Sequence, residues 1–425
     1  MTVKANNKTI PYPSSKKKVL TRPNYLLFAI WPFMGFLSAL KGFHLKSNRN
    51  VVYLFLALFG FTFVLGNEAM DSYSYAQRLK ETALLPFSEF WNVARGLYEQ
   101  ETTLDIMMPL VNFIVSRFTS DHRILFGVWA LIFGFFYLKS INLLHERYFY
   151  NRNINALFFL VFFIFLNPIT NINGFRMWTA AWIFFYGAYH VVLYRDIKYL
   201  FLAILSVLFH FSFLSASLIL VSYYFLGNRN LLFYLFLAAS VIIPEISIEY
   251  ARTISDFFGE GVAERAARYT GESAMEGVAT RQERARELGK WYLYLPSMSL
   301  RYFFIGAFFY VKFQYSKLAN TAELKNLYSF GLLFLGFANF VAVIPSMGRF
   351  YTIFYLFVTV FVFNIMIRLK TPNIQLVSLV GLIPFFLMMT VFLRVALDII
   401  NPWLFTFLPL PFIFDDTSLY QFLFN

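Results

Sequence analysis

The sequence predicts an all-α integral membrane protein with about eleven or twelve membrane helices, and three observations lead to this fold class. The chain of 425 residues is 59% hydrophobic and only 14% charged, whereas a soluble domain carries about 25% charged residues. Apolar runs recur along the chain, and a helix needs about 20 apolar residues to cross a bilayer. These runs do not alternate apolar and polar residues, so they predict a helical bundle and not a barrel.

The apolar runs also give the order of the expected segments. A polar and basic tail over residues 1–23 comes before a single transmembrane domain over 24–425. The tail does not have the pattern of a cleavable signal peptide, because no short apolar core with a small-residue cleavage site follows it. The expected membrane segments, some of them short and re-entrant, are 24–40, 51–66, 122–143, 154–170, 176–193, a pair within 199–226, 231–245, 291–311, 326–345, 350–367 and 374–394.

Lysine and arginine set the expected orientation, because cytoplasmic loops carry most of these residues. The connections predicted to be cytoplasmic hold ten Lys and Arg in total, and they are 145–153, 194–198, 227–230, 312–325 and 368–373. The segments predicted to be extracytoplasmic are 67–121, 246–290 and 395–425. The net charge of +13 is therefore explained by membrane orientation, and we expect no nucleic-acid partner.

Two apolar segments do not fit the pattern of one full membrane crossing for each helix. Both ends of 199–226 are expected on the cytoplasmic side, yet two full crossings need about 40 residues. We therefore predict a pair of short helices that enters the membrane and returns, with its tip at residues 210–212. The segment 24–40 has basic residues beyond both ends, so it either crosses once or dips in without crossing, with Pro32 in its middle.

Three arginines lie where a basic residue is not expected. Arg176 and Arg349 each begin a membrane segment directly after a short outer loop that contains a glycine, and Arg301 lies about ten residues into 291–311. Each has an ordinary explanation, which is contact with lipid phosphates at the membrane surface. The alternative is an anion clamp, because a guanidinium binds phosphate through two parallel donors and stays charged at any working pH.

Candidate bases lie near the same outer surface. His210 is at the tip of the short helical pair, where a neutral imidazole would accept a proton, although a lone histidine also fits a packed core. Glu68 and Asp71 directly follow a membrane segment, so they are either a helix cap and solvated charge or a general base or metal ligand. Tyr73 and Tyr75 are suited to sugar stacking and hydroxyl contacts.

Several chemistries have no support in the sequence. There is no cysteine, which excludes disulfides and thiolate catalysis. No Gly-rich phosphate loop and no HExxH motif is present, so neither ATP use nor zinc proteolysis is indicated. The segment 246–290 holds eight acidic and seven basic residues, a pattern typical of a solvated helical face or of a mobile lid over an outer site.

Five stretches of the sequence form a recognisable series, and they are 71–75 (DSYSY), 174–180 (GFRMWTA), a basic turn around Lys198, 208–212 (LFHFS) and 348–351 (GRFY). In these stretches the chain resembles the EpsG-like family, which belongs to the wider group of Wzy-type polysaccharide polymerases that make O-antigen, capsule or exopolysaccharide. The resemblance covers about residues 50–360. The family often has Gln where this chain has Met177.

The resemblance implies a GT-C-like enzyme of the bacterial plasma membrane. It would transfer a glycan from undecaprenyl diphosphate to a hydroxyl of an incoming lipid-linked repeat unit, with a chain-length regulator and a flippase as partners. Arg176, Arg349 and Arg301 would meet the charge of the leaving diphosphate, and Asp71 or His210 would be the base. The transition state would resemble an oxocarbenium ion, and no metal, nucleotide or other cofactor is required.

Three other functions remain as alternatives. A glycosyltransferase that uses a polyprenyl-phosphate sugar would place an acidic pair, here Glu68 and Asp71, in its first outer loop and would need a divalent metal. A ligase would move finished glycan to another acceptor. A flippase or transporter would be no enzyme, but transporters usually show inverted repeats, and the sequence shows none.

Overall fold

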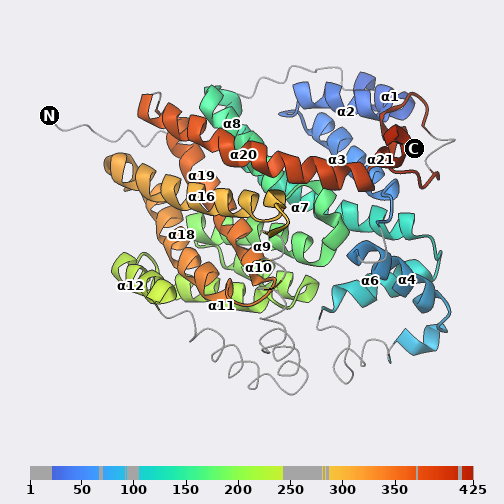
Figure 1. The fold of residues 1–425 in the computed structure, drawn as a ribbon, viewed down its shortest axis with the longest axis horizontal. Coiled ribbons are helices and arrows are strands. Elements are labelled where there is room, and N and C mark those ends of the chain that lie inside the picture. Colours follow the sequence, from blue (N-terminus) through green and yellow to red (C-terminus); the bar gives the residue numbers. More distant parts are fainter. Residues whose placement is uncertain are drawn as a thin grey trace.

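The computed structural model describes residues 22–66, 70–90, 92, 105–242, 280, 283, 287–369, 372–409 and 414–424. Within these residues all regular elements are helices (Figure 1). The helices of six or more residues are α1 (Arg22–Ile30), α2 (Pro32–Lys41), α3 (Lys46–Phe61), α4 (Asp71–Ala83), α6 (Met107–Ser116), α7 (His122–Asn151), α8 (Ile154–Leu166), η2 (Ile169–Gly174), α9 (Phe175–Tyr194), α10 (Ile197–Phe209), α11 (Phe213–Leu226), α12 (Asn230–Ile242), α16 (Leu295–Gln314), α18 (Ala322–Val341), α19 (Phe350–Met366), α20 (Pro372–Ile399) and α21 (Leu419–Phe424).

The predicted polytopic helical fold is confirmed. In the described part of the chain, five stretches are long and apolar enough to cross a membrane, and they are His122–Tyr150, Ile154–Tyr194, Ala322–Val341, Met347–Met366 and Asn373–Ile399. The shorter apolar helices α6, α10, α11 and α12 add to these. The protein is therefore a multi-pass membrane protein, and the predicted eleven or twelve membrane helices include such shorter pieces. Helix α6, which lies beside α4 at one edge of the molecule (Figure 1), was not expected from the sequence.

Polar residues fix where the helices begin. The side chains of Asp121, Asn153 and Asp196 each accept a hydrogen bond from the backbone N–H two residues later, at the starts of α7, α8 and α10. Such N-caps satisfy a donor that the first helical turn leaves without a partner. Helix α11 ends at Gly227, which has φ of 64°, a conformation that glycine adopts without steric cost.

The bundle is built around helices that are buried on all sides. In the α19 stretch 89% of the residues are buried, against 22% in the α20 stretch, so α20 presents most of its apolar surface to lipid. Aromatic rings fill the interior, as Phe175 stacked on Trp129 at 4.1 Å illustrates. Helices α9 and α10 approach closely at Gly187, where a Cβ would lie 2.7 Å from the backbone of Ala203; small residues allow this contact.

The predicted helical pair within 199–226 is confirmed as a pair of helices. Helices α10 and α11 have 13 and 14 residues, and the chain turns between them at residues 210–212. The segment 24–40 is also interrupted, because α1 ends before Trp31 and α2 begins at Pro32. A Cβ on Gly35 would lie 2.5 Å from the Cα of Phe28, so α2 folds back against α1 and the two do not form one continuous span.

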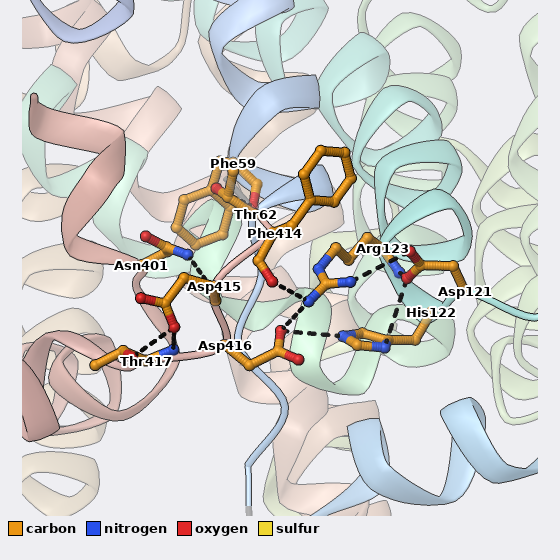
Figure 2. Close-up of polar contacts among 10 residues, drawn as sticks. All are labelled: Phe59, Thr62, Asp121, His122, Arg123, Asn401, Phe414, Asp415, Asp416 and Thr417. Atoms are coloured by element: carbon orange, nitrogen blue, oxygen red, sulfur yellow. Dashed lines mark hydrogen bonds and ion pairs between the residues drawn. The ribbon is translucent and has the colours of Figure 1, made fainter. Parts of the chain in front are cut away.

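The segment that follows α20 closes over the start of α7 (Figure 2). Arg123 pairs with Asp416 at 2.8 Å and with Asp121 at 3.2 Å, and it donates to the carbonyl oxygen of Phe414 at 2.6 Å. We call these contacts the C-terminal clasp. The short helix η5 (Pro402–Phe405) of the same segment packs against α2, where the Phe405 ring lies 4.9 Å from that of Phe33.

The opposite end of the long helices has its own charged cluster. Glu323 at the start of α18 pairs with Arg147 of α7 and, at 3.3 Å, with Arg368 beyond α19. These groups belong to connections that the charge distribution predicts to be cytoplasmic. Among the predictions made from the sequence, those on Glu68, on residues 1–21 and on most of 246–290 fall outside the described residues.

Candidate functional site

The start of α9, the α10–α11 turn and the start of α19 lie at one end of the bundle. The Met177 sulfur lies 4.0 Å from the Ser212 hydroxyl, and the Phe213 ring packs against the Phe350 ring at 5.2 Å. We call this end of the molecule the Arg176 end. Lysine and arginine distribution predicts that it faces the extracytoplasmic side.

A buried carboxylate organises the Arg176 end. Arg176 donates from Nη1 to Asp105 Oδ2 at 2.9 Å and from Nε to the Tyr75 hydroxyl at 3.0 Å. The Asp105 side chain is only 5% exposed, and that of Arg176 is 24% exposed. A buried charge is stable only when it is paired and hydrogen-bonded, so these groups hold one another in a single arrangement.

The same carboxylate connects Arg176 to the α10–α11 turn. Asp105 Oδ1 accepts the backbone N–H of Phe211 at 2.8 Å, while its Oδ2 is used by Arg176. One side chain therefore fixes both a guanidinium at the start of α9 and the turn that carries His210. None of the described residues hydrogen-bonds to Nη2 of Arg176, so its two N–H donors are left for a ligand.

Tyr75 supports this arrangement from α4. Its side chain is 3% exposed, and its ring lies against Phe175 at 4.3 Å and beneath the Arg176 guanidinium at 5.4 Å. Burial raises the pKa of the Tyr75 hydroxyl, and the neighbouring Arg176 opposes the shift. The ring has no open face for the sugar stacking that the sequence suggested, so any such contact is left to Tyr73, which is half-buried.

His210 lies in the turn between the two short helices. Its Nδ1 is 2.7 Å from the Ser212 hydroxyl and 3.4 Å from the Ser212 backbone nitrogen. A backbone N–H only donates, so both contacts fit an Nδ1 that accepts, and this tautomer carries the proton on Nε2. The contacts with Ser212 thus occupy the nitrogen that would accept a proton, so the imidazole in this state is not a ready base.

Asp71 is the first residue of α4 and is exposed. A Cβ added to Gly174 would lie 3.6 Å from Asp71 Oδ2, which places the carboxylate over the backbone just before Arg176. The charge of Asp71 also acts on the Arg176 guanidinium. The structure thus brings together Asp71 and Tyr75 of α4, Arg176 of α9 and the 210–212 turn, which are three segments far apart in the sequence.

Arg301 belongs to a second cluster at the same end. Its Nη2 donates to Asn339 Oδ1 at 3.4 Å, and its guanidinium lies over the Tyr351 ring at 4.5 Å. The helix that carries it, α16, begins at Leu295, so Arg301 lies in its second turn. Arg349 is exposed, two residues before Tyr351, and no described side chain pairs with it.

Asp105 is the functional candidate that the sequence did not reveal. It is one of eight acidic residues in 67–121, and nothing in its local sequence separates it from solvated charge. A comparison with protein families adds the evidence on identity, because the model of the EpsG family matches residues 49–409. The chain belongs to the EpsG family. Comparisons with curated proteins and with solved structures give no match.

Family membership indicates what kind of protein this is. An EpsG-family chain is a polysaccharide-polymerase-type membrane protein with a glycosyltransferase-like activity. The matched range contains the whole candidate site, from Asp71 to Arg349. It also contains Asp105 and both helices of the α10–α11 pair, so the buried network is part of the region that matches the family.

Proposed function

We propose that this EpsG-family protein polymerises oligosaccharide repeat units carried on undecaprenyl diphosphate. The reaction takes place at the extracytoplasmic face of a bacterial plasma membrane. The growing glycan leaves its lipid carrier and is transferred to a sugar hydroxyl of an incoming lipid-linked unit. The observation that carries the proposal is the buried Arg176–Asp105–Tyr75 network, which presents a fixed guanidinium beside two candidate bases at one end of the bundle.

The network suits a diphosphate leaving group. The bond between the anomeric carbon and the diphosphate oxygen breaks, and negative charge grows on the diphosphate. The free Nη2 of Arg176 meets this charge, and because Asp105 and Tyr75 already hold the guanidinium, little reorganisation is needed. Pairing with Asp105 reduces the net charge at this point, so we assign Arg349, which is exposed and unpaired among the described residues, to the same diphosphate.

The acceptor needs a base on the other side of the reacting carbon. Its hydroxyl oxygen forms the new glycosidic bond, and the proton passes to the base. Asp71 supports this role better than His210 does, because its carboxylate is exposed and lies beside Arg176. The contacts of His210 Nδ1 with Ser212 occupy the nitrogen that would accept a proton, so we assign His210 to positioning the 210–212 turn.

The test is polymerisation in vitro with purified protein in lipid nanodiscs and lipid-linked repeat units. We expect Arg176→Ala to lower turnover by about 10²-fold or more, the effect typical of losing a preorganised donor to a developing charge. Arg176→Lys should recover only part of it, because lysine lacks the planar pair of donors. Arg394→Ala is the matched control, since Arg394 also covers a tyrosine ring, that of Tyr292 at 4.8 Å, outside the proposed site.

The same assay separates the alternatives. Full activity in a chelator argues for the metal-independent polymerase over a metal-dependent enzyme that uses a polyprenyl-phosphate sugar. A single transfer to a foreign acceptor, with no growth of the chain, would identify a ligase. Normal polymer from a folded Arg176→Ala protein, judged by its elution in size-exclusion chromatography, would contradict the proposed role of the network.

A further inference from the structure

A cavity of about 260 Å³ opens at the Arg176 end, away from the Arg176–Asp105 network. It is lined by Ser240 and Val241 of α12, Arg301 of α16, Asn339 of α18, and Ala342 and Val343 just beyond α18. Its volume is several times the roughly 30 Å³ that one water occupies in the liquid. The cavity therefore has room for a small polar group such as a phosphate.

The polar wall of this cavity is held in place by hydrogen bonds. Asn339 donates to the Ser240 hydroxyl at 3.2 Å, and its Oδ1 accepts from both Arg301 and the Tyr351 hydroxyl. Ser240 is 5% exposed and donates to the Leu237 carbonyl at 2.6 Å. The amide oxygen and the hydroxyl are thus used within the wall, and the groups that remain for a ligand are N–H donors, those of Arg301 and the second N–H of the Asn339 amide.

The two arginine clusters differ in how their charge is compensated. The charge of Arg176 is paired with Asp105, whereas no carboxylate of the described residues pairs with Arg301. The guanidinium of Arg301 uses one contact to Asn339 and covers the Tyr351 ring, which leaves most of its five N–H donors available. An unpaired guanidinium that lines a cavity is a binding group for an anion.

The proposed reaction needs a second anion site. Both substrates carry a diphosphate, and like charges held at one point would repel. The donor's diphosphate leaves from the reacting carbon, so it must lie beside the candidate bases near Arg176. The acceptor keeps its diphosphate, which is one repeat unit away from the hydroxyl that attacks, so its binding site lies apart from the bases.

We propose that the Arg301 cavity binds the diphosphate of the acceptor substrate. This inference rests on the proposed polymerase function. Val241 and Ile242, at the end of α12 beside the cavity, are 68% and 75% exposed. These apolar side chains face the bilayer, so the lipid chain of the acceptor stays in the bilayer while its headgroup is bound. The headgroup enters the cavity, and its repeat unit reaches along the Arg176 end to Asp71.

Binding of a soluble analogue tests the site directly. With the protein in phosphatidylcholine nanodiscs, we expect two equivalents of farnesyl diphosphate to bind. Arg301→Ala should weaken one of the two by about tenfold or more, the loss expected for a charge-assisted contact, while Arg301→Lys should keep part of it. Arg394→Ala is the control and should bind both equivalents. Inorganic diphosphate should bind more weakly, and farnesol should not compete.

Kinetics test the assignment to the acceptor. Arg301→Ala should raise the KM for the acceptor with little change in kcat, whereas Arg176→Ala should lower kcat. The inference is overturned if Arg301→Ala binds both equivalents like the wild type, or if phosphatidylglycerol in the nanodisc displaces farnesyl diphosphate from the Arg301 cavity. These results would leave the polymerase proposal intact. If the wild type makes no polymer but still binds through Arg301, the proposed function fails and the anion site stands.

Discussion

At the scale of single residues, the structure adds a second role for Arg176. The sequence marked it as a guanidinium out of place on the outer side of the membrane, which fits a phosphate contact. The structure adds that Asp105 and Tyr75 already bind two of its nitrogens. Arg176 is therefore both a binding group and the centre of a buried network that also holds the α10–α11 turn.

The identity of the base is a prediction at this same scale. We expect Asp71→Asn to lower the turnover of purified enzyme by about 10²–10⁴-fold, the usual contribution of positioned proton transfer. His210→Gln should mainly raise the KM for the acceptor, because the contacts of His210 Nδ1 with Ser212 assign this side chain to positioning the 210–212 turn. The measurement is the dependence of initial polymerisation rate on acceptor concentration for both variants.

The opposite pattern would reverse the assignment. A large fall in kcat for His210→Gln, together with wild-type kcat for Asp71→Asn, would make His210 the base. Wild-type turnover in both would exclude both residues. Glu81→Gln is a matched control, because Glu81 is an exposed carboxylate on the same helix, α4, ten residues further along.

At the scale of helices, the predicted membrane orientation of the loops was more informative than the helix propensity of the residues. The requirement that both ends of 199–226 lie on one side, with too few residues for two crossings, predicted two short helices and their turn at 210–212. The structure has both. By contrast, α6 was not predicted because its ten residues are too few for a membrane span and lie within an acidic segment.

The side of the membrane that each helix end faces is a testable prediction at this scale. We expect Tyr420→Cys to react with a membrane-impermeant maleimide in intact cells, and Arg152→Cys to react only after the membrane is opened. The natural chain has no cysteine, so each variant carries one reactive group, and both positions are exposed. Labelling of Tyr420→Cys only from the cytoplasmic side would contradict the predicted orientation and the return of the α10–α11 pair.

At the scale of the whole molecule, the C-terminal clasp joins the segment after α20 to the start of α7, and further contacts within that segment support it. Besides the Arg123 contacts, Asn401 donates to the Asp415 carbonyl at 2.6 Å and Trp403 donates to the Asp415 carboxylate at 3.1 Å. Leu408 donates to the Ile30 carbonyl at 2.9 Å, which connects the segment after α20 to the break between α1 and α2. The described part of this segment is therefore held against the bundle by several hydrogen bonds.

We expect acid to release this clasp. A hydrogen bond from the Thr417 hydroxyl, followed by that from Trp403, holds the pKa of Asp415 below its ordinary value. A carboxyl group with a lowered pKa in the folded state stabilises that state above its unfolded pKa, about 3.9, and this contribution is lost as the pH falls through the folded pKa. Hydrogen exchange of residues 414–424 should accordingly rise below about pH 4.

A variant sharpens this prediction. Thr417→Val removes the first donor to Asp415, so the pKa of that carboxyl should return towards its ordinary value and the clasp should open at a higher pH than in the wild type. Thr406→Val is the control, because the Thr406 hydroxyl donates to the Trp403 carbonyl at 2.9 Å and does not contact Asp415. An unchanged midpoint in Thr417→Val would show that Asp415 does not control release.

The sequence by itself determined the class of fold, the order of the membrane segments, the 210–212 turn and the family, because bilayer length, apolar runs and loop charge are all properties of local sequence. It also selected Asp71, Arg176, His210, Arg301 and Arg349 as chemically unusual for their positions. Only the tertiary structure decided which of them meet. Whether a carboxylate such as Asp105 is solvated or buried against Arg176 depends on how α9 and the α10–α11 turn pack against the segment before α6. The residues next to Asp105 in the sequence do not indicate this packing, because it is a long-range contact.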